Sequence, residues 1–341
     1  MRNILIAMLL SAAPAAAQDW VTPEVCAIGP PDLSNAKLYA DIGAAGDALP
    51  VNGVGRLWRV EAPGGKVSHL WGSMHDTHPK ITAVPRQLQQ IIKKARIVAP
   101  EFDPRPKSRA EITQTLKAED RWRKTDGLPS PHDWLNPEER SWIEARMTAL
   151  AFEPEWLDYF TLPALFEFVL SAPCMDFNYA FQIQDYEIMQ DAVEAGATIV
   201  GMEPSDQIKK DLSDPKRRAT AIAAIRLYVG YLNPEAYQME PPLAFGQYIK
   251  GAIGLMMTDD RAAALKYFGA EEGARIWGLT QAYLVDERNR GFLETIAPEL
   301  QRGGVLMVMG AFHLPGDTGM VAILRDAGFT VTRVPTDGEL P

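Results

Sequence analysis

The chain has 341 residues, of which 47% are hydrophobic, and a formal net charge of −10. This hydrophobic content supports a folded core and excludes a mainly disordered protein. The acidic charge argues against nucleic acid or an anionic membrane surface as the main partner. The length suits one large α/β domain or two smaller ones.

The first 17 residues have the three parts of a cleavable signal peptide. Arg2 precedes a short apolar run at 4–10, and small residues ending in Ala15-Ala16-Ala17 follow it. The run is far shorter than the roughly 20 residues that span a bilayer. We therefore predict a periplasmic or secreted mature protein, with a retained anchor as the alternative. No later stretch is long and apolar enough to predict a transmembrane segment.

Two cysteines occur, Cys26 and Cys174. In an oxidising compartment they could form a disulfide, whereas two buried free thiols are the alternative. Neither lies in a Cys-x-x-Cys motif or beside a histidine, so zinc-finger and thiol-redox functions have no support.

The predicted elements begin after an N-terminal segment, residues 18–55, that is rich in Pro, Gly, Ala and Asp. A β-hairpin follows, because two β-prone runs flank the turn signal Pro63-Gly64-Gly65. The other elements alternate between helical periodicity and short apolar runs. The predicted strands are 57–60, 67–71, 97–99, 198–200, 305–309 and 330–334, and the predicted helices are 85–95, 110–116, 137–151, 156–170, 185–195 and 320–327, with further helices from 205 to 301.

Helix–Gly–strand units recur in this order and favour an α/β fold with a parallel or mixed central sheet flanked by helices. We place this domain at residues 56–341, with helical insertions at about 105–180 and 205–301.

Polar residues follow four of the predicted strands. They are His75 in Gly72-Ser73-Met74-His75, Glu101, Glu203, and His313 in Gly310-Ala311-Phe312-His313. Ligands of open α/β sheets bind in the crevice outside the carboxyl ends of the strands. In each Gly-x-x-His motif the glycine allows a sharp turn off the strand, and the histidine returns to the rim. We therefore expect two imidazoles and two carboxylates to converge there.

Two histidines with one or two carboxylates suit a divalent transition metal that keeps open coordination positions. The alternative is a set of unrelated polar residues that cap loops. Among the other histidines, His69 is expected to be a structural or rim residue, His78 a polar loop residue and His132 solvated. Asp185 lies near a predicted helix start and is expected to be its N-cap.

These motifs resemble the TraB/GumN family, which includes the Tiki proteins, from residue 57 to the end. The first stretches of this chain that carry the resemblance are LWGSMH, RIVAPEFD and IQDYEIMQDAVEAGATIVGMEPSDQ. The Glu287-Arg288-Asn289 segment and GGVLMVMGAFHLPGDTGMVAILRDAGFTVTRV complete it. The final stretch, with its Gly-x-x-His-Leu-Pro-Gly, is the most specific. The chain departs from the family pattern at Thr77-His78-Pro79, where Gly-Asp-Pro is usual, and at Ile183, where Gly is usual.

The resemblance implies a Tiki/TraB-like fold and a metal-dependent hydrolase site, of peptidase type in the Tiki branch. By matching position, His75, Glu101 and His313 would hold a Mn, Co or Zn ion. Glu203 would be a general base or a further ligand. Arg288 and Asn289 match the Arg-Asn pair of the family and would orient the substrate.

The sequence thus predicts an exported metal-dependent hydrolase that acts on a peptide or an ester. The alternatives are a non-catalytic ligand- or haem-binding protein on the same fold, as in the related ChaN-like proteins, and an interaction protein whose site has lost its chemistry.

Overall fold

The computed structural model describes residues 49–76, 79–103, 130–149, 152–170, 183–233 and 244–340. The expected signal peptide, both cysteines and the predicted helix at 110–116 lie outside these ranges. The strands are β1 (Leu57–Glu61), β2 (Val67–Ser73), β3 (Ile97–Pro100), β4 (Thr198–Ile199), β5 (Val305–Gly310) and β6 (Thr330–Arg333).

The strands form one six-stranded mixed sheet in the order β4-β3-β5-β2-β1-β6. The strands β4, β3, β5 and β2 run parallel to one another, whereas β1 runs antiparallel to β2 and to β6. The predicted hairpin is β1–β2, in which Leu57 pairs with Trp71 and Glu61 with Val67. The expected mixed sheet with flanking helices is confirmed.

The helices follow the predicted order with small differences at their ends. The helices that follow β2 and β3 are α4 (Pro79–Thr82), α5 (Arg86–Ile92), α7 (Pro137–Ala149), α8 (Leu162–Leu170) and α9 (Gln184–Glu194). The later helices are α10 (Gln207–Ser213), α11 (Arg218–Gly230), α13 (Ile253–Phe268), α14 (Ala270–Gln281), α15 (Arg288–Arg302) and α16 (Met320–Asp326). Short 3₁₀ turns are η4 (Pro131–Asp133), η5 (Pro154–Tyr159), η7 (Pro215–Arg217) and η9 (Ala311–His313), and η8 (Ala282–Glu287) is π-helical.

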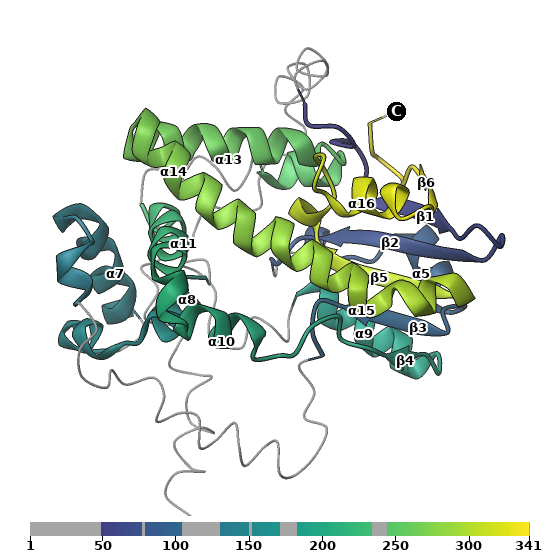
Figure 1. Cartoon of the computed structure of the whole chain (residues 1–341), viewed down its shortest axis with the longest axis horizontal. Helices are drawn as coiled ribbons and strands as arrows, with labels where there is room; N and C mark the ends of the chain where they lie inside the picture. Colours follow the sequence, from purple (N-terminus) through teal and green to yellow (C-terminus); the bar gives the residue numbers. More distant parts are fainter. Residues whose placement is uncertain are drawn as a thin grey trace, which may run out of the picture.

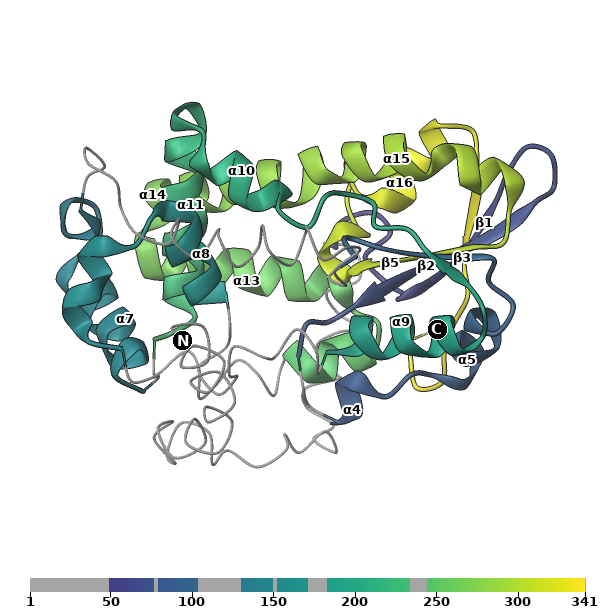
Figure 2. The ribbon, with the colours of Figure 1, turned by 90° about the horizontal axis from the view of Figure 1, so that it is seen from below.

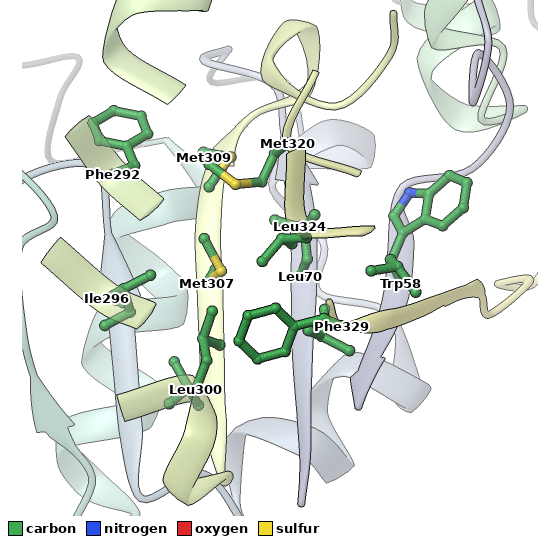
Figure 3. Close-up of a cluster of buried hydrophobic side chains, with 14 of the residues drawn as sticks. Trp58, Leu70, Phe292, Ile296, Leu300, Met307, Met309, Met320, Leu324 and Phe329 are labelled. Atoms are coloured by element: carbon green, nitrogen blue, oxygen red, sulfur yellow. The ribbon is translucent and has the colours of Figure 1, made fainter. Parts of the chain in front are cut away.

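Side chains of β5 alternate between two hydrophobic cores because successive residues of a strand point to opposite faces. Met307 and Met309 pack with Phe292 of α15 and Leu324 of α16 on one face (Figure 3). Leu306 and Val308 face the other side, among buried residues of α5 and α9. The sheet is therefore a middle layer between α15 and α16 on one side and α5 and α9 on the other (Figure 2).

A third hydrophobic core lies beside the sheet, among α7, α8, α10 and α11 (Figure 1). These four helices form a helical layer. Helices α14 and α15 and the intervening η8 form one continuous helical segment that runs from this helical layer onto the sheet (Figure 1). No helix in the described ranges is long and apolar enough to cross a membrane.

One predicted helix, 156–170, is wrong as a single element. The structure has the 3₁₀ turn η5 and the helix α8, separated by Thr161 and by Phe160, which is extended. The reason is Pro163, which lacks a backbone N–H and is tolerated only in the first turn of a helix. Helix α8 therefore begins at Leu162, one residue before it.

Gly72, in β2, allows the strand end to pack directly on the turn that carries the second motif. A Cβ added at Gly72 would lie 2.5 Å from Leu314 Cδ1 and 3.1 Å from Ala311 Cα. We expect Gly72→Ala to lower the free energy of unfolding by about 1–3 kcal/mol through overpacking. The control is Gly64→Ala, since a Cβ there has no atom within 4 Å. Urea denaturation measures both, and equal stability of the two variants would contradict this packing constraint.

Candidate functional site

The polar residues predicted from the strand ends all lie at one edge of the sheet. They follow four adjacent parallel strands: Glu203 after β4, Glu101 after β3, His313 after β5 and His75 after β2. The backbone N–H of Glu203 donates to the carbonyl oxygen of Glu101 at 2.8 Å, which continues the pairing of β3 and β4 beyond the strands. The two carboxylates therefore lie side by side.

His313 is buried, and its ring is held by Asn289 of α15. Its Nδ1 lies 2.7 Å from Asn289 Oδ1. Because a carboxamide oxygen only accepts hydrogen bonds, this contact assigns the proton to Nδ1 and leaves the lone pair on Nε2. Burial, together with the charges of Arg288 and His75, lowers the pKa of His313 to about 4, although Glu101 opposes the shift. The ring is therefore neutral at pH 7.

Asn289 is fully buried, and it also donates from Nδ2 to the carbonyl oxygens of His313 and Thr318, at 3.1 and 3.0 Å. Its oxygen and its nitrogen thus both have protein partners. These contacts hold His313 in place, and the role of Asn289 in orienting a substrate stays a prediction.

Glu101 is buried and has a partner for each carboxylate oxygen. Oε1 accepts from the backbone N–H of Gly310 at 2.7 Å, and Oε2 lies 2.5 Å from Arg288 Nη2. Burial alone would raise the pKa of Glu101. The Arg288 guanidinium, followed by the two site histidines, outweighs burial and holds this pKa well below its usual range. Glu101 is therefore charged at neutral pH.

Arg288 connects these groups, because all five of its N–H groups have acceptors. Nη2 contacts Glu101 and also Glu203 Oε1 at 2.6 Å, and Nε lies 3.2 Å from both Glu203 oxygens. Nη1 donates to the carbonyl oxygen of Leu284 at 3.2 Å and lies 3.4 Å from His313 Nε2. Each N–H of Arg288 thus has an acceptor within the protein, and its role in orienting a substrate stays a prediction.

The π-helical η8 ends directly before Arg288. Single π-helical turns inside α-helices are frequent at functional sites. A neighbouring segment secures this turn, since Arg217 forms a salt bridge with Glu287 and Tyr283 OH lies 3.2 Å from Asp211 Oδ2. Arg288 thus projects from a helix that the helical layer holds in place.

Glu203 differs from Glu101 in its electrostatics. Burial raises the pKa of Glu203, and the neighbouring Glu101 and Asp211 add to the rise, whereas hydrogen bonding to Arg288 opposes it. One arginine thus serves two carboxylates whose pKa values move apart. Such a separation is typical of carboxyl pairs that divide acid–base and charge-holding roles.

His75 is more accessible than His313, with 44% of its side chain exposed. His75 Nε2 and Glu101 Oε1 both lie close to Gly310. A Cβ added at this glycine would be 3.8 Å from the former atom and 3.4 Å from the latter. The same Nε2 is 3.5 Å from Asp185 Oδ1. Desolvation by the surrounding protein lowers the pKa of His75. The carboxylates of Asp185 and Glu101 outweigh this effect and raise the pKa to about 9.

Asp185 was missed as a site residue, and its prediction as an N-cap is wrong. Helix α9 begins at Gln184, and the N-cap position belongs to Ile183. Asp185 is the second helical residue, is buried, and accepts from Ser73 Oγ at 2.8 Å. A sequence signal was present, since Ser73 and Asp185 both fall in stretches that match the family.

The residues before the two histidines share one hydrophobic cluster. Met74 and Phe312 pack there with Ile81, Tyr248 and Ala311. Both Gly-x-x-His segments are therefore anchored to the same cluster. His69 lies within β2 opposite Arg59, away from this edge, and His78 lies outside the described residues.

A divalent ion fits the chemistry of these donors but not their present arrangement. Glu101 Oε1 and His313 Nε2 are 3.7 Å apart. Small movements would therefore let both atoms lie about 2.0–2.2 Å from one zinc ion placed between them. His75 Nε2 would have to turn away from Asp185. In the described part of the chain, no group of three acidic, histidine or cysteine side chains has the arrangement needed to bind a metal ion.

The comparison with protein families agrees with the resemblance seen in the sequence. Residues 56–333 match the TraB/PrgY/gumN family, so the chain belongs to this family. Neither a curated protein nor a solved structure gives a significant match.

Replacing Arg288 tests its place at the centre of the site. We expect Arg288→Met to lower the free energy of unfolding by about 3–5 kcal/mol at pH 7, since it leaves two buried carboxylates unpaired. In the wild type, the lowered pKa of Glu101 stabilises the fold above the unfolded pKa of about 4.3, and this contribution fades at lower pH. The deficit of the variant should therefore shrink below about pH 4, because the carboxyls of both unfolded chains and the unpaired glutamates of the folded variant become protonated there.

Urea titrations from pH 3 to 8 measure the deficit. Arg302→Met, at an exposed salt bridge on the same helix, is the control. A deficit that stays constant across this range would contradict the charge pairing.

Proposed function

We propose that this protein is an exported hydrolase that uses a divalent metal ion to act on a peptide or an ester. His313, Glu101 and His75 would hold the ion, with Mn, Co or Zn as the candidates. The observation that carries the proposal is the state of His313. Its Nδ1–H donates to Asn289, and its unprotonated Nε2 lies 3.7 Å from Glu101 Oε1 and 3.4 Å from Arg288 Nη1. A metal-binding histidine characteristically donates its other N–H to a fixed acceptor.

The two carboxylates support a division of labour. Glu101 stays charged and suits a cation, whereas Glu203, with its raised pKa, suits a general acid or base. Such an ion, when bound, would acidify a water molecule and polarise a carbonyl group. Arg288 fixes the relative position of the carboxylates. Asn289 keeps His313 in the tautomer that offers Nε2.

Metal analysis of the purified mature protein tests this function. After loading with Zn²⁺, Mn²⁺ or Co²⁺ and dialysis, we expect about one ion per chain, because three donors from one site complete most of a coordination shell. His313→Ala, Glu101→Gln and His75→Ala should each lose it. His69→Ala is the matched control, as it removes a histidine of the same β2 segment that lies away from the site.

A panel of peptide and ester substrates then tests hydrolysis by the loaded protein. Stable metal-free protein, or metal content that the three substitutions leave unchanged, would exclude the metal site. An absorbance scan after haem addition distinguishes the alternative: a Soret band lost in His75→Ala and His313→Ala would make the protein a haem binder. Absence of metal, haem and hydrolysis would leave an interaction protein.

Export rests on the order of charge, apolar run and small residues in the first 17 positions. Expressed with its full N-terminus in a Gram-negative host, the protein should be recovered from the periplasm and begin near Gln18. Mass spectrometry of the intact chain measures this. An Ala15→Arg, Ala17→Arg double variant should stay uncleaved because the cleavage position needs small residues. A cytoplasmic product that starts at Met1 or Arg2 would exclude export.

A further inference from the structure

The two edge strands of the sheet, β4 and β6, differ in how their outer backbone groups are used. The carbonyl group of Val331 in β6 points away from β1, because Val334 donates to Leu57 and hydrogen-bonded pairs alternate along antiparallel strands. Arg325 of α16 donates to this carbonyl oxygen from Nε and Nη2, at 3.2 and 2.8 Å. Charged side chains commonly protect an edge strand in this way, since its unpaired groups are a template for another strand. Residues 195–202, which contain β4, are all uncharged.

The pairing of β4 with β3 decides which backbone groups of β4 point outward. The N–H groups of Thr198 and Val200 donate to carbonyl oxygens in the segment 96–98, at 3.0 and 3.1 Å. Since successive N–H groups of a strand point to opposite sides, those of Ile199 and Gly201 face away from β3. In the described part of the chain, neither has an acceptor.

The side chains of this segment leave its outer edge free, because they pack above and below the sheet. Ile199 packs against the core that includes α5 and α9, and Val200 packs against the core of α15 and α16. The outer edge, by which we mean the side of residues 199–201 turned away from β3, is therefore formed by backbone. Figure 1 shows β4 at the lower border of the sheet.

This outer edge leads directly to the candidate site. Glu203 comes two residues after Gly201, which is about 7 Å along an extended chain at about 3.3 Å per residue. The N–H of Glu203 donates to the carbonyl oxygen of Glu101 at 2.8 Å, so the chain beyond the outer edge remains beside β3. A second chain that lay along the outer edge would thus reach the rim where the two carboxylates lie.

An extended peptide is the ligand that such an edge suits. In this mode of recognition the ligand becomes an additional strand, and its backbone hydrogen bonds supply the affinity. The outward N–H groups at 199 and 201 are two residues apart, which is the repeat of a strand. An ester without a peptide backbone has no matching row of acceptors.

We propose that an extended peptide substrate pairs with the outer edge of residues 199–201 and is thereby directed to the site at the rim. The inference rests on the proposed function, because it selects peptides over esters as the substrate class. A second copy of the chain, paired through the same edge, is the competing occupant that the test must distinguish.

Hydrogen exchange measured by NMR on metal-free mature protein tests the pairing, with a library of random-sequence decapeptides as the probe. At saturating concentration, the probe should slow exchange of the Ile199 and Gly201 amides by about tenfold, since a bonded amide exchanges only after the bond opens. The amides of Thr198 and Val200 should change little, because they are already bonded to the β3 segment.

Ile199→Pro removes one outward N–H and leaves the pairing with β3 intact. Proline is tolerated in an edge strand where its missing N–H would face solvent. The dissociation constant for the fluorescein-labelled library, measured by fluorescence anisotropy, should rise by about tenfold, the equivalent of one lost hydrogen bond. Ile199→Val keeps the N–H and a branched side chain, so this matched control should bind as the wild type does. The exchange measurement decides the matter if Ile199→Pro does not fold.

Two results would overturn the proposal. One is exchange at Ile199 and Gly201 that the probe leaves unchanged. The other is a dimer, detected by light scattering, that becomes monomeric in Ile199→Pro, because the outer edge would then belong to a second copy of the chain.

The hydrolysis assays keep this inference apart from the proposed function. Protection of both amides without hydrolysis ends the proposed function and retains the outer edge as a peptide-binding site. Conversely, hydrolysis by the metal-loaded protein with both amides unprotected rejects the peptide-binding edge alone.

Discussion

The site depends on one interaction, the pairing of the Arg288 guanidinium with the carboxylates of Glu101 and Glu203. Four adjacent parallel strands bring two glutamates, each with a side chain only about a tenth exposed, to one sheet edge, where their charges repel each other. A single planar cation with five donors satisfies both and also contacts His313. Arg288 reaches this position because η8 and α15 run from the helical layer onto the sheet (Figure 1). The helical layer thus determines where the charge at the sheet edge is neutralised.

The two Gly-x-x-His motifs look equivalent in sequence but differ in the folded protein. His313 is buried and neutral beside an amide, whereas His75 is half-exposed and faces a carboxylate. The partners come from α15 and α9, which cover opposite faces of the sheet (Figure 2). The site therefore combines an uncharged nitrogen, a strongly acidic carboxyl, a weakly acidic carboxyl and a histidine that favours its proton. Groups whose pKa values differ in this way can act as acid and as base within one site.

Much of the fold followed from local patterns in the sequence. The unbroken apolar run 305–309 predicted a buried strand, and Met307 and Leu306 indeed face different cores. Glycine at 196 and 328, both with positive φ, correctly indicated where helices end. The strand ends were predictable as well, because parallel neighbours finish at a common edge, so His75, Glu101, Glu203 and His313 could be grouped from sequence. Local period failed at 156–170, where Pro163 sets the helix start.

The sequence by itself determined the strands, their flanking helices and the residues that end on the rim. These are properties of periodicity and of chain direction, which act over a few residues. Only the tertiary structure decided which partner each rim residue received. Arg288 lies 187 positions from Glu101, and Ser73 lies 112 positions from Asp185. Whether a polar residue caps its own helix, contacts substrate or holds a histidine depends on which remote groups surround it, because burial and neighbouring charge set both its hydrogen bonds and its pKa.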